Sequence, residues 1–156
     1  MENMTGKYLT FSLGKEEYGL PIQRVKEIIG MMEITKVPQT PGFVKGVINL
    51  RGKVIPVIDL RSKFLMQACD ETERTCIVVV EFHRESSLIL VGMVVDTVSE
   101  VLNIKSDNIE GSSQLGLQLS SEYLLGMAKT DNGVKMLLNM DSIIGGSDID
   151  SIDKAA

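Results

Sequence analysis

The stretch "GVINLRGKVIPVIDL", Gly46–Leu60, consists of two apolar runs joined by a polar turn at Arg51-Gly52. Apolar runs of this length on either side of a short turn that contains glycine predict a β-hairpin. Pro56 interrupts the second run and has no N–H for a strand ladder, so we expect that strand at a sheet edge or at a barrel corner. The continuous apolar run 54–58 predicts burial on both faces, one inside its own barrel and the other against a second unit.

The same order of features occurs twice in the chain, which predicts two related halves. The segment "YGLPIQRVKEII" (18–29) aligns without a gap on "VGMVVDTVSEVL" (91–102), at an offset of 73 positions. The segment "TPGFVKGVINLRGKVIPVIDL" (40–60) aligns on "SSEYLLGMAKTDNGVKMLLNM" (120–140), at an offset of 80. The polar stretch "QACDETER" (67–74) lies between the halves, and we place the join there.

Each half predicts five short strands and one short helix. The first helix is expected at 40–46, where Thr40 would be the N-cap and Gly46 would end the helix. Ser120 and Gly126 repeat this pattern in the second half. The last two strands of each half should form a hairpin.

The second hairpin carries Asp131-Asn132-Gly133, which is a strong signal for a type I′ turn. Short strands joined by turns, without long helices, predict small closed barrels rather than an α/β sheet. We therefore expect a mainly β fold of two five-stranded barrels on a shared hydrophobic core. One domain would span residues 1–150, with subdomains at about 7–66 and about 74–145, exchange of strands at the join left open, and a flexible tail at 146–156.

Charge and composition argue against several classes of function. The chain has 16 Lys and Arg against 21 Asp and Glu, a net charge of −5, and a pI near 4.9. This balance does not favour binding to nucleic acid or to an anionic membrane surface. We see no secretory signal pattern, and the most apolar window is too short and too charged to cross a bilayer. We expect a cytoplasmic protein without direct membrane insertion.

No pattern of residues predicts catalysis, a metal site or a cofactor. The sequence lacks HExxH, GxSxG, P-loop and GxGxxG motifs. The single histidine, His83, is expected in a solvated turn, and Cys69 and Cys76 are expected to be free thiols because their spacing fits neither a redox pair nor a zinc site. The aromatic side chains lie within apolar runs and should be in the core, so protein recognition is the predicted function.

Arg51 stands out because the repeat does not reproduce it. Glycines and core positions recur in both halves, whereas Asp131 is the counterpart of Arg51. The hairpin can therefore close without an arginine, and two interpretations stay open: a solvated turn charge or a contact with a partner. Glu27 recurs as Glu100, which favours a structural role for Glu27.

At "EYGLPIQRVKEIIG" (17–30) and "ITKVPQTPGFVKGVINLRGKVIPVIDLRSKF" (34–64) the chain resembles the CheW family, the coupling proteins of bacterial chemotaxis. The resemblance runs from about residue 8 to residue 144. It implies SH3-like barrels around a common core, and a non-catalytic adaptor that bridges the cytoplasmic tips of chemoreceptors to the regulatory domain of the kinase CheA. Residue by residue, it implies a receptor-binding set made of Val25, Glu27, Lys45, Gly46 and Arg51.

The same resemblance implies a kinase-facing surface on the second half. It would lie near Gly92, Val95 and Val98, although core packing would explain these three residues equally well. The adaptor would be a monomer when isolated, without a cofactor, and would be recruited to membrane-associated receptor arrays.

The loop 108–120 departs from the family pattern. Family members that form rings can have a basic residue and an aromatic residue there, whereas this chain has Glu110, Gln114 and Leu115. Ring formation through this loop is therefore in doubt, or it uses a different arrangement of charges.

Overall fold

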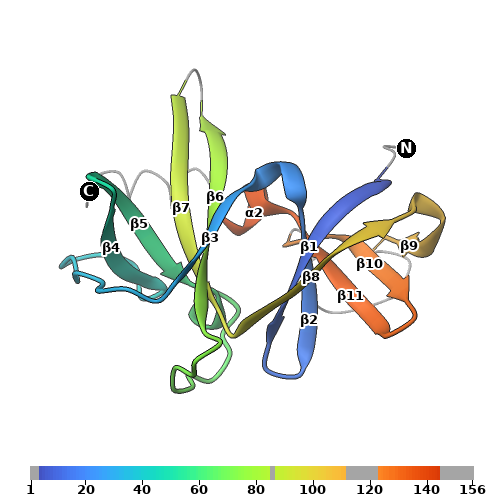
Figure 1. The fold of residues 1–156 in the computed structure, drawn as a ribbon, viewed down its shortest axis with the longest axis horizontal. Helices are drawn as coiled ribbons and strands as arrows, with labels where there is room; N and C mark the ends of the chain where they lie inside the picture. The colour runs from blue at the N-terminus through green and yellow to red at the C-terminus, as the bar shows by residue number, and fades with distance from the viewer. Residues whose placement is uncertain (1–3, 85–86, 112–122, 145–156) are drawn as a thin grey trace.

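The fold consists of two β-sheets and a few short helical segments (Figure 1). The structure is a computed structural model, and it describes residues 4–84, 87–111 and 123–144. The five-stranded sheet has the strand order β3 (Val25–Gly30), β6 (Cys76–Arg84), β7 (Ser87–Val95), β5 (Lys53–Asp59), β4 (Val44–Leu50). The six-stranded sheet has the order β8 (Thr97–Ile104), β1 (Gly6–Leu13), β2 (Glu16–Pro21), β11 (Gly133–Leu138), β10 (Leu124–Thr130), β9 (Ile109–Glu110). The helical segments are η1 (Ile22–Arg24), α1 (Leu60–Lys63), η2 (Ser106–Asn108) and α2 (Met140–Ile143). The predicted mainly β fold with short helices is confirmed.

Each sheet takes hairpins from both halves of the repeat. In the six-stranded sheet, β2 pairs in parallel with β11, so that Gly19 lies opposite Leu137. In the five-stranded sheet, β5 pairs in parallel with β7, so that Val57 lies opposite Gly92. These two pairs occupy equivalent places in the repeat, and each joins a hairpin of the first half to a hairpin of the second.

The closed barrels that we expected are not formed by the hydrogen bonding of the described strands. Pairing in the six-stranded sheet ends at β8 on one side and at the two-residue β9 on the other, and the five-stranded sheet ends at β3 and β4. An ion pair between Arg51, in the β4–β5 turn, and Glu27 of β3 links the two edge regions of the five-stranded sheet. The sheet therefore curls until its edge regions meet without a ladder between β3 and β4. Besides the ion pair, two backbone hydrogen bonds between Thr35 and Val47 join β4 to the segment that follows β3.

The largest hydrophobic core lies between the two sheets. Both sheets contribute fully buried side chains to it, among them Phe11, Leu20, Ile58, Phe82 and Met93. Two smaller cores lie within the separate sheets, one around β5 and β6 and the other around β1, β10 and β11. The aromatic side chains are buried or half-buried against these cores, as predicted.

The apolar strand β5 is buried on both faces, with one exception. Ile55 and Val57 belong to the core of their own sheet, and Ile58 belongs to the core shared by both sheets. Val54, expected to be buried, is 53% exposed because it lies next to the hairpin turn.

Pro56 was expected at a sheet edge or at a barrel corner. The edge alternative is wrong, because β5 is an inner strand of the five-stranded sheet. Pairing with β7 begins at Val57, one residue after the proline. On the β4 side, Pro56 lies opposite Val47, three pairs along from the turn-closing pair Leu50–Lys53. Hydrogen-bonded and non-hydrogen-bonded pairs alternate in an antiparallel ladder, so the missing N–H points away from β4 and no bond with that strand is lost.

The predicted helix at 40–46 is wrong. The Val44 N–H donates to the Pro41 carbonyl at 3.0 Å in a turn, and β4 begins at Val44. The Thr40 hydroxyl donates to a backbone carbonyl instead of capping a helix. Gly46 has a φ of 147° and lies at a β-bulge, where the pairing register of β4 with β5 shifts. Gly126 lies at the equivalent bulge of β10.

The type I′ geometry occurs in the first hairpin and not in the second, where it was predicted. Arg51 and Gly52 have φ values of 52° and 86°, and a type I′ turn requires positive φ at both central residues. In the second hairpin the positive φ, 113°, falls on Gly133, while Asp131 and Asn132 keep negative φ.

The prediction for His83 is wrong in part, and several other predictions fall on residues outside the described ranges. His83 is exposed as expected, but it lies in β6, opposite Leu88, rather than in a turn. Ser120, Gln114, Leu115 and the predicted tail 146–156 lie outside the described residues.

Candidate functional site

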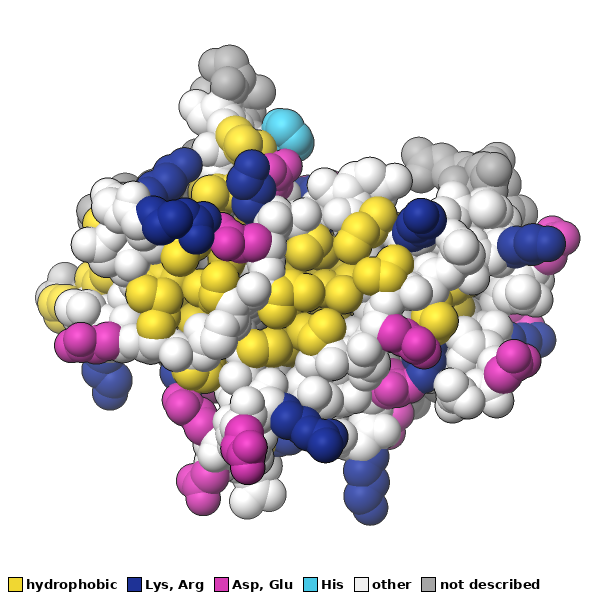
Figure 2. All heavy atoms as spheres, viewed as in Figure 1, with side chains coloured by type: hydrophobic (Ala, Val, Ile, Leu, Met, Phe, Trp, Pro, Cys, Tyr) yellow, Lys and Arg dark blue, Asp and Glu magenta, His cyan; other side chains and the backbone are white. Residues whose placement is uncertain are grey.

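β3 and β8 are the equivalent edge strands of the two sheets, and both cross the same face of the molecule (Figure 1). Ile28 of β3 and Val101 of β8 occupy equivalent positions in the repeat, and they are 43% and 49% exposed. Hydrophobic side chains gather over β3 and toward β8 on this face (Figure 2). Exposed apolar area beside two strand edges is typical of a protein-binding surface. We call this area the β3–β8 face.

Arg51 and Glu27 form a bidentate ion pair at β3. Arg51 Nη1 donates to Glu27 Oε2 at 3.3 Å, and Nη2 donates to Oε1. The hydrogen bond with the carboxylate raises the pKa of the Arg51 guanidinium. The side chain of Arg51 is still 69% exposed, so further N–H donors of the planar guanidinium face solvent.

The turn holds Arg51 in a left-handed backbone conformation. The Gly52 N–H donates to Asn49 Oδ1 at 2.8 Å, which closes the turn. A non-glycine residue at this φ costs about 1 kcal/mol, and glycine, asparagine or aspartate would fit the position better. The structure shows one use of the side chain held at this cost, the ion pair with Glu27, so Arg51 is not simply a solvated turn charge. The partner contact stays a prediction.

Lys45 and Gly46 are at the other end of β4 from Arg51. They lie near the start of β4, and at about 3.3 Å per residue this places them roughly 15–20 Å from the turn. Gly46 is buried, and a Cβ atom at this position would be 2.1 Å from the Thr35 carbonyl oxygen. Its role in the isolated chain is to let β4 pass close to the preceding segment.

Val25 and Val98 are repeat equivalents that pack, half-buried, against the core between the sheets. Val95 is fully buried in that core, and a Cβ atom on Gly92 would be 2.8 Å from Ile77 Cγ2. Gly92 and Val95 are therefore packing positions in the isolated chain, and of the three proposed kinase positions only Val98 has accessible surface. The kinase contact stays a prediction.

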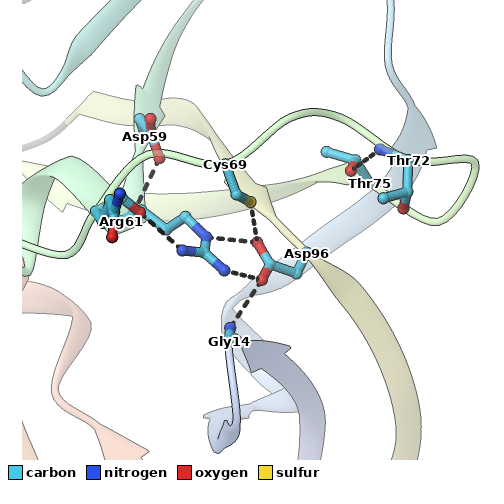
Figure 3. Close-up of polar contacts among 8 residues, drawn as sticks. Gly14, Asp59, Arg61, Cys69, Thr72, Thr75 and Asp96 are labelled. Atoms are coloured by element: carbon cyan, nitrogen blue, oxygen red, sulfur yellow. Dashed lines mark hydrogen bonds and ion pairs between the residues drawn. The ribbon is translucent and has the colours of Figure 1, made fainter.

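Sequence reasoning missed a polar joint between the sheets (Figure 3). Asp96, between β7 and β8, accepts from Arg61 Nε at 2.9 Å, from Arg61 Nη2 at 2.5 Å and from the Gly14 N–H at 2.7 Å. Arg61 Nη1 also donates to the Gln67 carbonyl at 2.8 Å. The joint ties the β1–β2 turn, α1 and the β7–β8 connection together, and no local sequence signal marks it because its members are far apart in the chain.

Asp96→Asn is expected to lower the free energy of unfolding by about 1–2 kcal/mol near pH 7. The hydrogen bonds from Arg61, and then that from Gly14, hold the pKa of Asp96 below its ordinary value. A carboxylate with a lowered folded-state pKa stabilises the fold above its unfolded pKa, about 3.9, and this contribution is lost as pH falls through the folded-state pKa. Urea unfolding at about pH 7 and about pH 3 should therefore show a smaller acid loss in Asp96→Asn than in the wild type.

Asp141→Asn is the matched control for this joint. Arg24 lowers the pKa of Asp141 as well, but the Asp141 side chain is 69% exposed, so solvent screens the pair and the loss should be smaller. Equal effects of the two substitutions would contradict a special role for the joint.

The described residues contain no group of three or more His, Cys, Asp or Glu side chains placed to hold a metal ion. Cys69 and Cys76 are free thiols. None of the helices within the described ranges is long and apolar enough to cross a membrane.

Two curled sheets with a shared core and an exposed apolar face define a small β-module suited to binding other proteins. The chain belongs to the CheW-like domain family, whose model matches residues 7–147. It is 36% identical over 155 residues to the chemotaxis protein CheW of Klebsiella aerogenes, covering 99% of this chain and 91% of that protein. It is 31% identical to the chemotaxis protein CheW of Helicobacter pylori, covering 88% of this chain and 81% of that protein.

A solved structure gives the same result. The scaffolding protein TtCheW of Thermoanaerobacter tengcongensis superimposes with a TM-score of 0.81 at 34% identity, covering 93% of this chain and 96% of that one. The resemblance inferred from the sequence is confirmed.

Proposed function

We propose that this chain is a non-catalytic chemotaxis adaptor that couples the cytoplasmic tips of chemoreceptors to the regulatory domain of the histidine kinase CheA. It would act in the cytoplasm, at membrane-associated receptor arrays, without a cofactor. The observation that carries the proposal is the β3–β8 face, where equivalent edge strands expose equivalent apolar side chains beside the Arg51–Glu27 pair. The names of the relatives, chemotaxis protein and scaffolding protein, support it.

The receptor would bind at the β3–β8 face. Ile28 and Val101 supply apolar contact, and Arg51 supplies a planar fork of donors for carboxylate or carbonyl groups. Glu27 holds the guanidinium in place in the free chain, so little side-chain freedom is lost when a partner binds. Glu27 is in this view a positioning residue for Arg51.

The kinase would bind on the second half, through surface that includes Val98. Gly92 and Val95 would then act through the packing of β7 and not by direct contact. Binding of both partners to one module raises the effective concentration of one partner for the other. Control of the kinase also requires receptor contacts that differ between signalling states, because a ligand shifts an equilibrium only by its differential affinity.

Arg51→Glu tests the proposal. It places a second carboxylate against Glu27 and removes the donors, so binding of a purified receptor cytoplasmic fragment should weaken at least about tenfold. Binding of the kinase regulatory domain should not change, and the melting temperature should stay within about 2 °C because Arg51 is exposed. Pulldown and calorimetry on wild type and variant measure all three, and failure of the wild type to bind either partner would mean that this module serves other proteins.

Two controls separate contact from charge. Lys53→Glu makes the same change of charge in the same hairpin and should retain receptor binding; an equal loss would show a general electrostatic effect. The exchange Glu27→Arg with Arg51→Glu rebuilds the ion pair with its ends reversed. Recovery of binding in the exchanged chain would contradict a direct contact by Arg51, because binding would then depend on the presence of the ion pair and not on which position carries the guanidinium.

A further inference from the structure

A hollow of about 700 Å³ lies at the end of β4 and β5 opposite the Arg51 turn. The first residues of β4, the last residue of β5, the segment that leads into β4 and the residues that follow α1 form its walls. It is roughly 15–20 Å from Arg51 along β4, so it is separate from the β3–β8 face. It is not lined by Ile28, Val101 or Arg51, the residues named for the proposed receptor contact.

Leu65, on the rim of this hollow, occupies a backbone position where glycine is usual. The Leu65 N–H donates to the Ser62 carbonyl at 3.1 Å, and the Met66 N–H donates to the Arg61 carbonyl at 2.7 Å. These are the two bonds of the Schellman motif that ends a helix, and the residue at the position of Leu65 is usually glycine because its φ is positive. Leu65 has a φ of 59° and its residue surface is 93% exposed.

A leucine at this position has a conformational cost and almost no contact within the chain that offsets it. Gln39, another residue of the hollow, also has a positive φ, 62°. Residues that hold an unfavourable backbone conformation without a stabilising contact inside the chain are typical of binding sites. The side chain of Leu65 is therefore presented outward, next to Met66, Val37 and the start of β4.

The hollow is also positively charged in an acidic protein. Lys36 and Lys45 line it, and neither forms an ion pair or a side-chain hydrogen bond among the described residues. The lining includes one carboxylate, Asp59, which accepts from the Arg61 N–H at 3.0 Å as the N-cap of α1. The ammonium groups of Lys36 and Lys45 are therefore available to pair with a ligand in the hollow.

We propose that this hollow is a second docking site, which binds a partner protein through a segment whose carboxylates flank large apolar side chains. Lys36 and Lys45 would pair with the carboxylates, and Leu65 and Met66 would cover the apolar side chain. A segment of a protein fits better than a small molecule because Leu65 projects from the rim, where a ligand enclosed in the hollow would leave it exposed. The site is independent of the receptor contact proposed above.

A labelled peptide of sequence Glu-Asp-Leu-Ile-Asp-Glu is the probe, with fluorescence anisotropy on the full chain as the readout. Leu65→Gly should weaken binding at least about tenfold and leave or raise the melting temperature, since glycine is the favoured residue at this φ. Leu88→Ser removes another exposed leucine, on β7, and should bind the peptide as the wild type does. A peptide with serine in place of its leucine and isoleucine should bind weakly to every variant.

Charge is tested in the same assay. Lys36→Glu with Lys45→Glu should also weaken binding at least about tenfold, and salt should weaken the wild-type interaction. Lys7→Glu, at an exposed position on β1, should have no such effect. No binding by the wild type, or binding that Leu65→Gly and the lysine variants leave unchanged, would overturn the proposal.

The chain itself contains an acidic and apolar segment, "DIDSID" (148–153), outside the described residues. Replacement of its three aspartates by asparagine in the full chain separates this source from an external partner. Unchanged peptide affinity supports a site for another protein. A tenfold rise in affinity would show that these residues compete for the hollow, and would overturn the assignment to a partner.

Discussion

Gly46→Ala is expected to lower the free energy of unfolding by about 3 kcal/mol or more. The added Cβ would lie 2.1 Å from the carbonyl oxygen and 2.7 Å from the carbonyl carbon of Thr35, so it meets backbone that cannot rotate away. The φ of 147° is one that residues with a side chain rarely adopt. Relief of the clash would break the two hydrogen bonds, each 2.9 Å long, that join Thr35 to Val47.

Gly30→Ala is the matched control, since a Cβ at the end of β3 meets nothing within 4 Å and the φ is ordinary. Chemical denaturation should place Gly30→Ala within about 0.5 kcal/mol of the wild type. Similar stabilities for Gly46→Ala and Gly30→Ala would contradict the close packing of β4 on the preceding segment. Gly126 should behave like Gly46, because a Cβ there would be 2.7 Å from the Glu110 carbonyl oxygen.

The burial of Gly46 affects how a loss of receptor binding in a Gly46 variant should be interpreted. The resemblance to the family placed Gly46 with Arg51 in one receptor-binding set, yet Gly46 is buried and lies near the other end of β4. A Gly46 variant that loses receptor binding should therefore also lose stability, whereas Arg51→Glu should lose binding alone. Comparison of the two variants separates a position that shapes the sheet from one that contacts a partner.

The sequence predicted the strands well because their signals are local. Apolar runs and turns marked the hairpins, and the repeat aligned β3 with β8 and β5 with β11. The partners of the strands could not be predicted in the same way, because the parallel pairs β2–β11 and β5–β7 join segments far apart in the chain. The helix at 40–46 was wrong for a related reason: a proline after threonine and a later glycine fit a capped helix, and they fit a turn followed by a β-bulge equally well.

The candidate site was predicted in part. Arg51 was singled out because its counterpart is Asp131, and its positive φ gives an independent reason to consider it functional. Glu27 was given a structural role because Glu100 repeats it. The structure gives Glu27 an ion pair with Arg51 that links two regions of its sheet, whereas the peptide group of Glu100 bonds to the Thr10 hydroxyl. A recurring residue type does not fix its partner, which depends on how the sheet curls.

Lys135→Met is expected to lower the free energy of unfolding by about 2–3 kcal/mol. Lys135, in β11, is only 4% exposed and forms an ion pair with Glu17, which lies opposite it in the parallel β2–β11 pair. Removal of the lysine leaves a carboxylate that is 31% exposed without its counter-charge, and this partial exposure keeps the loss below that of a fully buried pair. Urea denaturation of the purified chain measures the difference.

The repeat supplies the rescue for this variant. Ile55 is the equivalent of Lys135 and Leu90 the equivalent of Glu17, and both are apolar and packed in one core of the five-stranded sheet. Glu17→Leu with Lys135→Ile should therefore return stability to within about 1 kcal/mol of the wild type, because a buried ion pair can be replaced by packed apolar residues. A double variant as unstable as Lys135→Met would contradict this equivalence.

Amide hydrogen exchange of the double variant tests a second role of the ion pair. If stability returns but the β2 and β11 amides exchange faster with solvent, the ion pair fixes the register between the two halves. A slip by one residue would bury Lys135 away from Glu17.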